Sequence, residues 1–115
     1  RMIRVLTLDL VDDAAAIAEY ERWHVPGNVP APVLAAIRAS GVQEMQIFRH
    51  GTRLVMTMTV APDFDPDAKA DADAADPEVA AWEARMGHFQ RALPGAPDGS
   101  RWTPMTPIFA LSDHP

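Results

Sequence analysis

Two alternating runs, "VQEMQIFRH" and "TRLVMTMTV", lie on either side of Gly51 and constrain the fold more than any other feature of the chain. Successive side chains of a strand point to opposite faces, so strict alternation predicts a strand with one buried face. Two such runs around a short glycine-containing turn predict a β-hairpin over residues 42–60. The second run would place Leu54, Met56, Met58 and Val60 on one face, and Val55, Thr57 and Thr59 on the other.

The segment before the hairpin predicts one strand and two helices. "MIRVLTLDLV", residues 2–11, is apolar on both alternating faces, which is typical of a strand covered on two sides. The alanine-rich residues 11–24 favour a helix that Asp12 or Asp13 would cap and that ends before Pro26 and Gly27. Residues 30–41 predict a second, short helix ending at a glycine.

The segment after the hairpin begins with an acidic stretch, residues 63–78, for which the composition predicts a solvated loop rather than a binding segment. Residues 76–93 predict an amphipathic helix, and "MTPIFAL", residues 105–111, a final short strand. The apolar residues of the predicted helix, spaced three or four apart, are Val79, Trp82, Met86, Phe89 and Leu93.

The order β–α–(α)–β–β–α–β is that of the ferredoxin-like, split βαβ arrangement, an α+β fold. We therefore expect one domain over residues 1–115, with a four-stranded antiparallel sheet and its helices on one face. The other face would carry apolar side chains of both predicted central strands. A second copy of the chain would cover this face, so we expect a homodimer.

Composition excludes several classes of function. The net charge is −6 and the basic residues are scattered singly, which argues against binding to nucleic acid or to an anionic membrane. The absence of cysteine excludes disulfides and thiolate metal sites, and no histidine has a partner at metal-ligand spacing, so we expect no metal. The apolar opening is too short and too interrupted to span a membrane. We expect a cytoplasmic, soluble protein.

Candidate chemistry lies at the end of the first predicted helix. Tyr20 and His24 are four residues apart, so their side chains would share one helix face. Histidine both donates and accepts a proton near neutral pH, and tyrosine adds a hydroxyl. Trp82, on the last predicted helix, would add an aromatic wall to a cavity beside Tyr20 and His24. The same pattern is also typical of structural residues: a histidine that lies near the last carbonyls of a helix, and a tryptophan in the core.

The stretch "MIRVLTLDLVDDAAAIAEYERWH" resembles the amino-terminal part of the L-rhamnose mutarotase family, and the resemblance continues through the hairpin, "DPEVAAWEARM" and "PIFAL". It implies a fold of the dimeric α/β-barrel type and an enzyme that interconverts the α and β anomers of a free sugar without a cofactor. It further implies that His24 is the general acid–base and that Tyr20 and Trp82 bind the sugar.

Two departures from the family pattern concern the sugar-binding residues. Glu83 follows Trp82 where rhamnose-specific members tend to carry a second tryptophan, and Met45 stands where they carry a tyrosine. These features resemble the L-fucose mutarotase branch of the family. The resemblance therefore implies L-fucose, rather than L-rhamnose, as the preferred substrate of this chain. Glu83 is then a candidate second proton-transfer group if it points inward near His24; the alternative is a solvated helix carboxylate.

Two other functions stay open. Ferredoxin-like homodimers include cofactor-independent monooxygenases of flat aromatic compounds, although the 7% aromatic content of this chain disfavours a site of that kind. A non-catalytic sugar-binding domain is the other alternative. A binder would hold sugar without accelerating anomer exchange, and a monooxygenase would consume oxygen.

Overall fold

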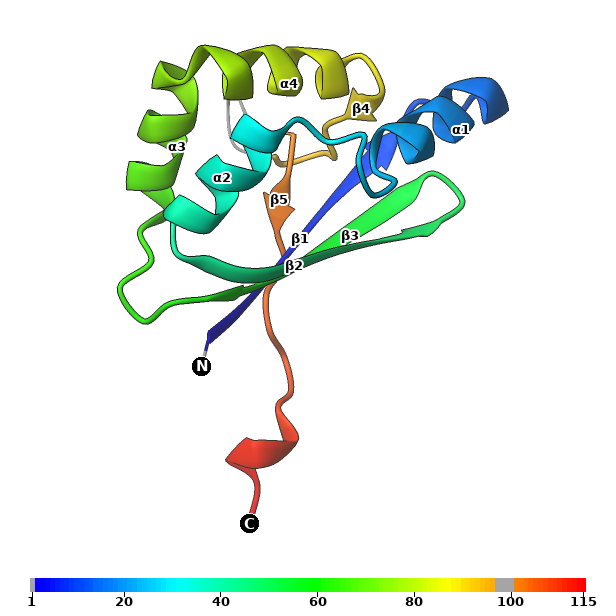
Figure 1. The fold of residues 1–115 in the computed structure, drawn as a ribbon. Coiled ribbons are helices and arrows are strands. Elements are labelled where there is room, and N and C mark those ends of the chain that lie inside the picture. Colours follow the sequence, from blue (N-terminus) through cyan, green and yellow to red (C-terminus); the bar gives the residue numbers. More distant parts are fainter. Residues whose placement is uncertain (1, 97–100) are drawn as a thin grey trace.

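The computed structural model describes residues 2–96 and 101–115, and its centre is an open antiparallel sheet with the helices on one face (Figure 1). Strand β1 (Met2–Leu10) pairs along one edge with β3 (Arg53–Val60), which pairs in turn with β2 (Val42–His50). Along the other edge, β1 pairs with two short strands, β4 (Gln90–Arg91) and β5 (Thr103–Pro104). The order β2-β3-β1-β4 confirms the predicted ferredoxin-like fold.

The predicted hairpin is confirmed. Gly51 adopts a φ of +60° at its turn, a conformation that glycine tolerates without strain. Met45 lies opposite Met58, and Ile47 lies opposite Met56, on the face that carries the helices. Leu54, Met58 and Val60 are buried there, as the alternation predicts.

The first two helices also follow the sequence pattern. Helix α1 (Ala14–Trp23) begins at Asp13, whose carboxylate accepts a hydrogen bond from the backbone N–H of Ala15. Helix α2 (Ala31–Ala39) ends just before Gly41, which has a φ of +95°. Between the two helices the chain turns through Gly27, so that the end of α1 faces α2 and the sheet.

The prediction of a solvated loop over residues 63–78 is wrong. Residues Pro66–Ala75 form helix α3. The Asp65 carboxylate accepts hydrogen bonds from the backbone N–H groups of Asp67 and Ala68, and Pro66 occupies the first turn, where its missing N–H costs nothing. The alanines that follow favour helix, so local capping outweighed the acidic composition.

Helix α4 (Pro77–Gly87) is shorter than the predicted helix, because the chain turns at His88 and Phe89 and pairs with β1 through Gln90. The predicted final strand is also misplaced. The pairing occurs at Thr103–Pro104, the N–H of Met105 still bonds to β1, and residues 106–110 then leave the sheet and lead to a 3₁₀ turn, Leu111–Asp113. In Figure 1 this C-terminal segment projects away from the body of the molecule.

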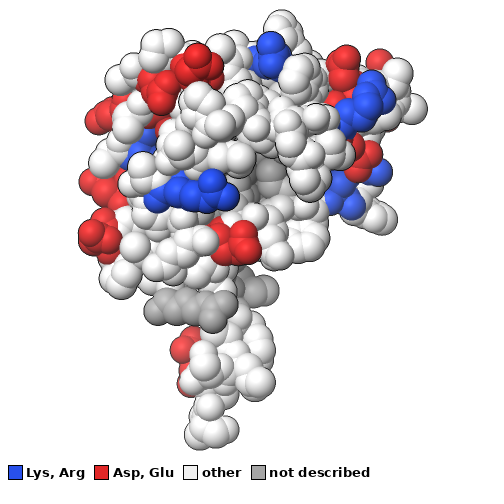
Figure 2. All heavy atoms as spheres, viewed as in Figure 1, with Lys and Arg blue, Asp and Glu red and all other residues white. Residues whose placement is uncertain are grey.

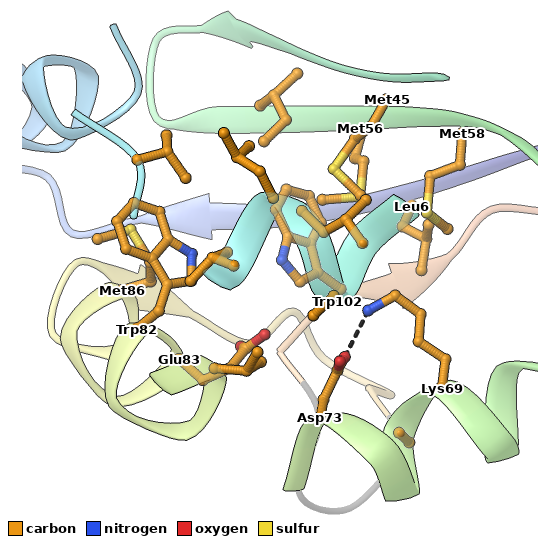
Figure 3. Close-up of a pocket in the computed structure, with 18 of the residues that line it drawn as sticks. Leu6, Met45, Met56, Met58, Lys69, Asp73, Trp82, Glu83, Met86 and Trp102 are labelled. Atoms are coloured by element: carbon orange, nitrogen blue, oxygen red, sulfur yellow. Dashed lines mark hydrogen bonds and ion pairs between the residues drawn. The ribbon is translucent and has the colours of Figure 1, made fainter. Parts of the chain in front are cut away.

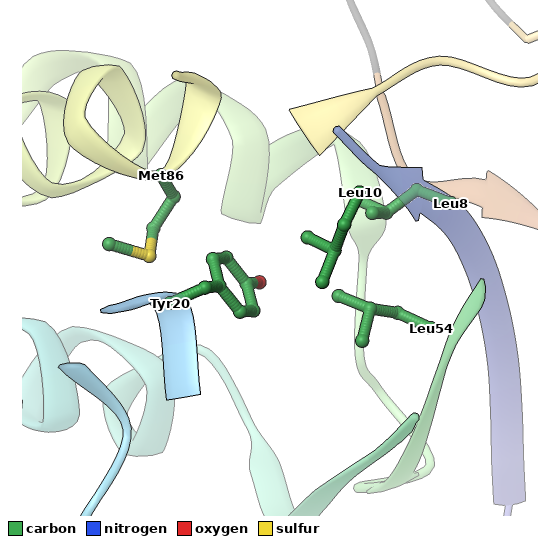
Figure 4. Packing of buried hydrophobic residues seen from close by; sticks show 5 residues of the cluster. All are labelled: Leu8, Leu10, Tyr20, Leu54 and Met86. Carbon is green, nitrogen blue, oxygen red and sulfur yellow. The ribbon is translucent and has the colours of Figure 1, made fainter. Parts of the chain in front are cut away.

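The side chains between sheet and helices form two buried clusters. One lies under α1 and α4 and is shown in Figure 4; it consists of Leu8, Leu10, Tyr20, Leu54 and Met86. The other lies at the opposite end of the hairpin and consists of Val42, Met58 and Val60. Leu6 and Met56 pack against this second cluster and also line a cavity under the helices.

Candidate active site

A cavity of about 400 Å³ lies between the strands and the helices, in the size range of roughly 300–1,000 Å³ that small-molecule sites occupy. Strands β1, β2 and β3 form one wall, and α2, α3 and α4 form much of the rest. Most of its lining is apolar, with a few polar groups at defined positions. Those whose side chains carry charge or hydrogen-bonding groups are Arg4, His24, Lys69, Asp73, Trp82, Glu83, Gln90 and Trp102.

His24 directly follows α1 and lines the cavity, and the backbone fixes the orientation of its ring. Its Nδ1 lies 2.7 Å from the backbone carbonyl oxygen of Tyr20. A carbonyl oxygen only accepts hydrogen bonds, so Nδ1 carries the hydrogen and donates it. In the neutral ring, Nε2 therefore holds the lone pair and is the atom able to take up a proton.

Tyr20 belongs to the core rather than to the cavity surface: only 3% of it is exposed, and it packs among Leu8, Leu10 and Met86 (Figure 4). Its ring lies 4.5 Å from the His24 ring, centroid to centroid. Gln90 lines the cavity and donates a hydrogen bond of 3.2 Å to the Tyr20 hydroxyl. Burial raises the pKa of Tyr20, an effect that the bond from Gln90 partly offsets.

Two indole rings face the cavity. The Trp82 ring, on α4, makes an edge-to-face contact with the His24 ring at 5.5 Å, centroid to centroid. Trp102 precedes β5, and Figure 3 shows both indoles projecting into the same space. Trp23 instead packs outside it, beneath the Arg85 guanidinium at 4.3 Å.

Glu83 lines the cavity next to Trp82 on α4, so it is not merely a carboxylate on the outer face of the helix. Burial raises the pKa of Glu83. Lys69 and Arg101 act in the opposite direction, and the negative charge of Asp73 adds to the increase. Glu83 as a residue is exposed, so its carboxyl is open to solvent, while the protein atoms around it disfavour its charge.

Met45 lies on the strand side of the cavity, together with Leu6, Met56 and Met58 (Figure 3). These four side chains form an apolar wall opposite the polar groups of α3 and α4. The structure therefore brings His24, Trp82, Glu83 and Met45 together around one cavity, whereas Tyr20 reaches it only through His24 and Gln90.

Sequence reasoning missed five polar residues that line the cavity: Arg4, Lys69, Asp73, Gln90 and Trp102. One signal was present, since Lys69 is the only lysine in the chain and stands alone within the acidic stretch, four residues before Asp73. Gln90 and Trp102 lie after the helices, and only the tertiary path of the chain brings them to the cavity.

The outer surface differs in character from the cavity. Acidic side chains gather on the side that α3 forms (Figure 2). Over residues 2–96 and 101–115, no group of three or more histidine, aspartate or glutamate side chains is placed to hold a metal ion. In the same residues, no helix is both long and apolar enough to cross a bilayer.

Comparison with known proteins identifies the family. The model of the L-rhamnose mutarotase family matches residues 3–111. The chain belongs to the L-rhamnose mutarotase family. Among its relatives, it is 56% identical to an L-fucose mutarotase from Xanthomonas campestris pv. campestris over 92% of this chain and 85% of that protein. It is 34% identical to a UPF0734 protein of Dictyostelium discoideum, over 90% and 85% of the two chains.

Solved structures agree on the fold. An L-rhamnose mutarotase from Formosa agariphila superposes with a TM-score of 0.64 at 18% identity, over 96% of this chain and 99% of that one. Tetracenomycin F2 cyclase from Streptomyces glaucescens, a type-II polyketide cyclase, superposes with a TM-score of 0.60 at 15% identity, over 96% of each chain. The expected family, a family of sugar isomerases, and its fold of the dimeric α/β-barrel type are therefore confirmed.

Proposed function

We propose that the protein is an aldose 1-epimerase that interconverts the α and β anomers of a free 6-deoxy-L-sugar, with L-fucose preferred over L-rhamnose. The observation that carries the proposal is the fixed imidazole of His24, whose Nε2 is available for proton transfer within an indole-lined cavity. The preference for L-fucose is supported by the 56% identity to an L-fucose mutarotase.

The proposed reaction requires two proton transfers. Nε2 of His24 removes the proton of the anomeric hydroxyl, the electron pair left on that oxygen forms a carbonyl, and the bond between C1 and the ring oxygen breaks. Glu83, whose pKa is raised by burial, delivers a proton to the ring oxygen. Rotation about the C1–C2 bond and the reverse transfers close the other anomer. A positioned acid–base group contributes roughly 10²–10⁴-fold, so this reaction requires no metal or organic cofactor.

The remaining cavity residues would hold the sugar. Trp82 and Trp102 offer flat apolar faces to the C–H surfaces of the ring, and Met45, with Leu6 and Met56, offers an apolar wall to the methyl group that a 6-deoxy sugar carries. In this proposal Tyr20 does not touch the sugar and acts through His24 and Gln90. Its carbonyl fixes the tautomer of His24 and its hydroxyl holds Gln90 toward the sugar.

We also propose that the protein works in the cytoplasm as a homodimer. Ile3 and Phe48 lie on the sheet face opposite the helices and are 63% and 55% exposed. The C-terminal segment adds Ile108, Phe109 and Leu111, all exposed. A second copy seated on this face would remove these apolar groups from water.

The experiment that tests the function is magnetisation transfer between the anomeric proton signals of free sugars. We expect the protein to accelerate exchange most for L-fucose, less for L-rhamnose and least for D-sugars. Saturable binding of L-fucose without any acceleration would contradict the proposal and favour a non-catalytic sugar-binding domain. Equal acceleration for L-fucose and L-rhamnose would refute the substrate preference alone.

A further inference from the structure

One end of the cavity carries an ion pair supplied by α3, the helix that composition did not predict. The Nζ of Lys69 lies 2.5 Å from Oδ2 of Asp73, four residues later on the same helix. Both side chains line the cavity and are largely buried, with 20% and 18% of their surface exposed (Figure 3). The other two ion pairs among the described residues, Arg49–Glu21 and Arg53–Asp9, are more exposed.

A partly buried ion pair loses hydrogen bonds to water, and other hydrogen bonds must replace them. An ammonium has three N–H donors, and a carboxylate accepts several hydrogen bonds through its two oxygens. Within residues 2–96 and 101–115, Lys69 and Asp73 form one side-chain hydrogen bond, and it joins them to each other. Taking both charges out of water is costly unless their remaining capacity is also satisfied. That capacity faces the cavity, where water or a ligand can use it.

A third polar group, on the strand wall of the same cavity, is also incompletely satisfied. The Nε of Arg4 is buried and has no hydrogen-bond partner among the described residues. The Arg4 guanidinium lies 5.7 Å from the centre of the Phe64 ring, and both residues line the cavity. This end of the cavity therefore holds more hydrogen-bonding groups than the protein uses for its own structure.

We propose that the Lys69–Asp73 pair is a specificity element that binds two neighbouring hydroxyl groups of the sugar. Nζ would donate to one hydroxyl oxygen, and the Asp73 carboxylate would accept from the adjacent hydroxyl. A bonded donor and acceptor suit a vicinal diol, because its two oxygens lie about as far apart as hydrogen-bonded atoms do. The inference rests on the proposed mutarotase function and adds a polar subsite on α3 that recognises hydroxyl groups.

The variant that tests this subsite must leave the charge near Glu83 balanced. Lys69 from α3 and Arg101 from the segment before β5 lower the pKa of Glu83, and Asp73 raises it. Changing one member of the pair alone would therefore also alter Glu83. The double variant Lys69→Met/Asp73→Leu removes both charges and keeps two apolar side chains of similar length in their place.

The experiment compares L-fucose with analogues that each lack one ring hydroxyl, using wild-type protein and the double variant. Hydrogen bonds to charged groups are among the stronger ones, so we expect wild-type protein to bind the analogue lacking a contacted hydroxyl about tenfold more weakly or worse. The double variant should bind L-fucose about as weakly as wild-type protein binds that analogue. It should no longer distinguish the analogue from L-fucose. The loss should appear in KM more than in kcat, since the pair does not itself transfer protons.

The matched control is Arg49→Met/Glu21→Leu, which removes an exposed pair with an Nε–Oε2 distance of 3.2 Å that does not line the cavity. This control should keep both the affinity for L-fucose and the discrimination. Discrimination by Lys69→Met/Asp73→Leu equal to that of wild-type protein would overturn the inference.

A second measurement does not depend on any variant. Because Lys69 is the only lysine, ¹³C-lysine labelling gives one set of side-chain signals, which should shift when L-fucose binds. An unchanged spectrum at saturating sugar would overturn the inference. If wild-type protein accelerates anomer exchange and these two tests fail, only the subsite is wrong; if wild-type protein accelerates no exchange at all, the proposed function itself fails.

Discussion

At the scale of single residues, the proposed site contains two kinds of residue: those that would transfer protons and those that would bind the sugar. His24 and Glu83 would transfer protons, whereas Trp82, Trp102 and the methionine wall would hold the sugar ring. The hydrogen bond from His24 to the Tyr20 carbonyl supports this proposal, because it leaves the lone pair of the neutral ring on Nε2.

The tryptophans provide an optical test of sugar contact. The chain has three, and two of them line the cavity. Aromatic contacts contribute about 0.5–1.5 kcal/mol, so Trp82→Leu and Trp102→Leu should each weaken L-fucose binding by up to roughly tenfold. Each should also reduce the change in fluorescence on binding. Trp23→Leu is the control, and a loss of binding there as large as in the other two would argue against indole contact with the sugar.

Glu83 should make stability depend on pH. The folded state keeps its proton to higher pH than the unfolded chain, whose glutamate pKa is near 4.5. From that value up to the raised pKa, the folded state binds more protons, so the free energy of unfolding falls as pH rises. Glu83→Gln should remove this decrease in a series of denaturant titrations. Glu19→Gln, on the exposed side of α1, should follow the wild-type curve; a Glu83→Gln curve parallel to wild type would contradict the raised pKa of Glu83.

At the scale of secondary-structure elements, local signals were sufficient for most of the fold. Alternation in residues 42–60 predicted the hairpin, and the capping residue Asp13 and the breakers after His24 bounded α1. Helix α3 was missed because composition was given more weight than the Asp-Pro sequence at residues 65–66, which caps it. The last strand was misplaced because its position depends on β1, where the N–H of Met105 donates to the carbonyl of Val5 at 2.8 Å. The same dependence hid Gln90 and Trp102.

Helix α3 depends on its cap more than α1, α2 and α4 do, because none of its residues is fully buried. Asp65→Ala should lower stability by about 1 kcal/mol and speed amide hydrogen exchange throughout α3. The KM for sugar should rise as Lys69 and Asp73 become mobile. Asp63→Ala, the same change two residues earlier, should have neither effect, and protection of the α3 amides in Asp65→Ala equal to wild type would contradict the capping role.

At the scale of the whole molecule, the most unusual feature is the apolar C-terminal segment that extends from the body (Figure 1). The whole molecule, with this segment, measures 47 × 30 × 30 Å. The side chains of the segment and the outer sheet face would both be covered in a dimer. Light scattering should give twice the mass of one chain, and Phe48→Asp should shift the equilibrium to monomer. Ala18→Asp, on the exposed side of α1, should leave the dimer intact. A monomeric wild-type protein at micromolar concentration would contradict the proposed assembly.

The most direct test of the proposed chemistry is the rate at which L-fucose anomers exchange in the presence of wild-type protein and of His24→Ala, both folded by circular dichroism. Because a positioned acid–base group contributes roughly 10²–10⁴-fold, the variant should lose at least about 99% of the catalysed rate. An exchange rate in His24→Ala equal to that of wild-type protein would show that the imidazole takes no part in the reaction.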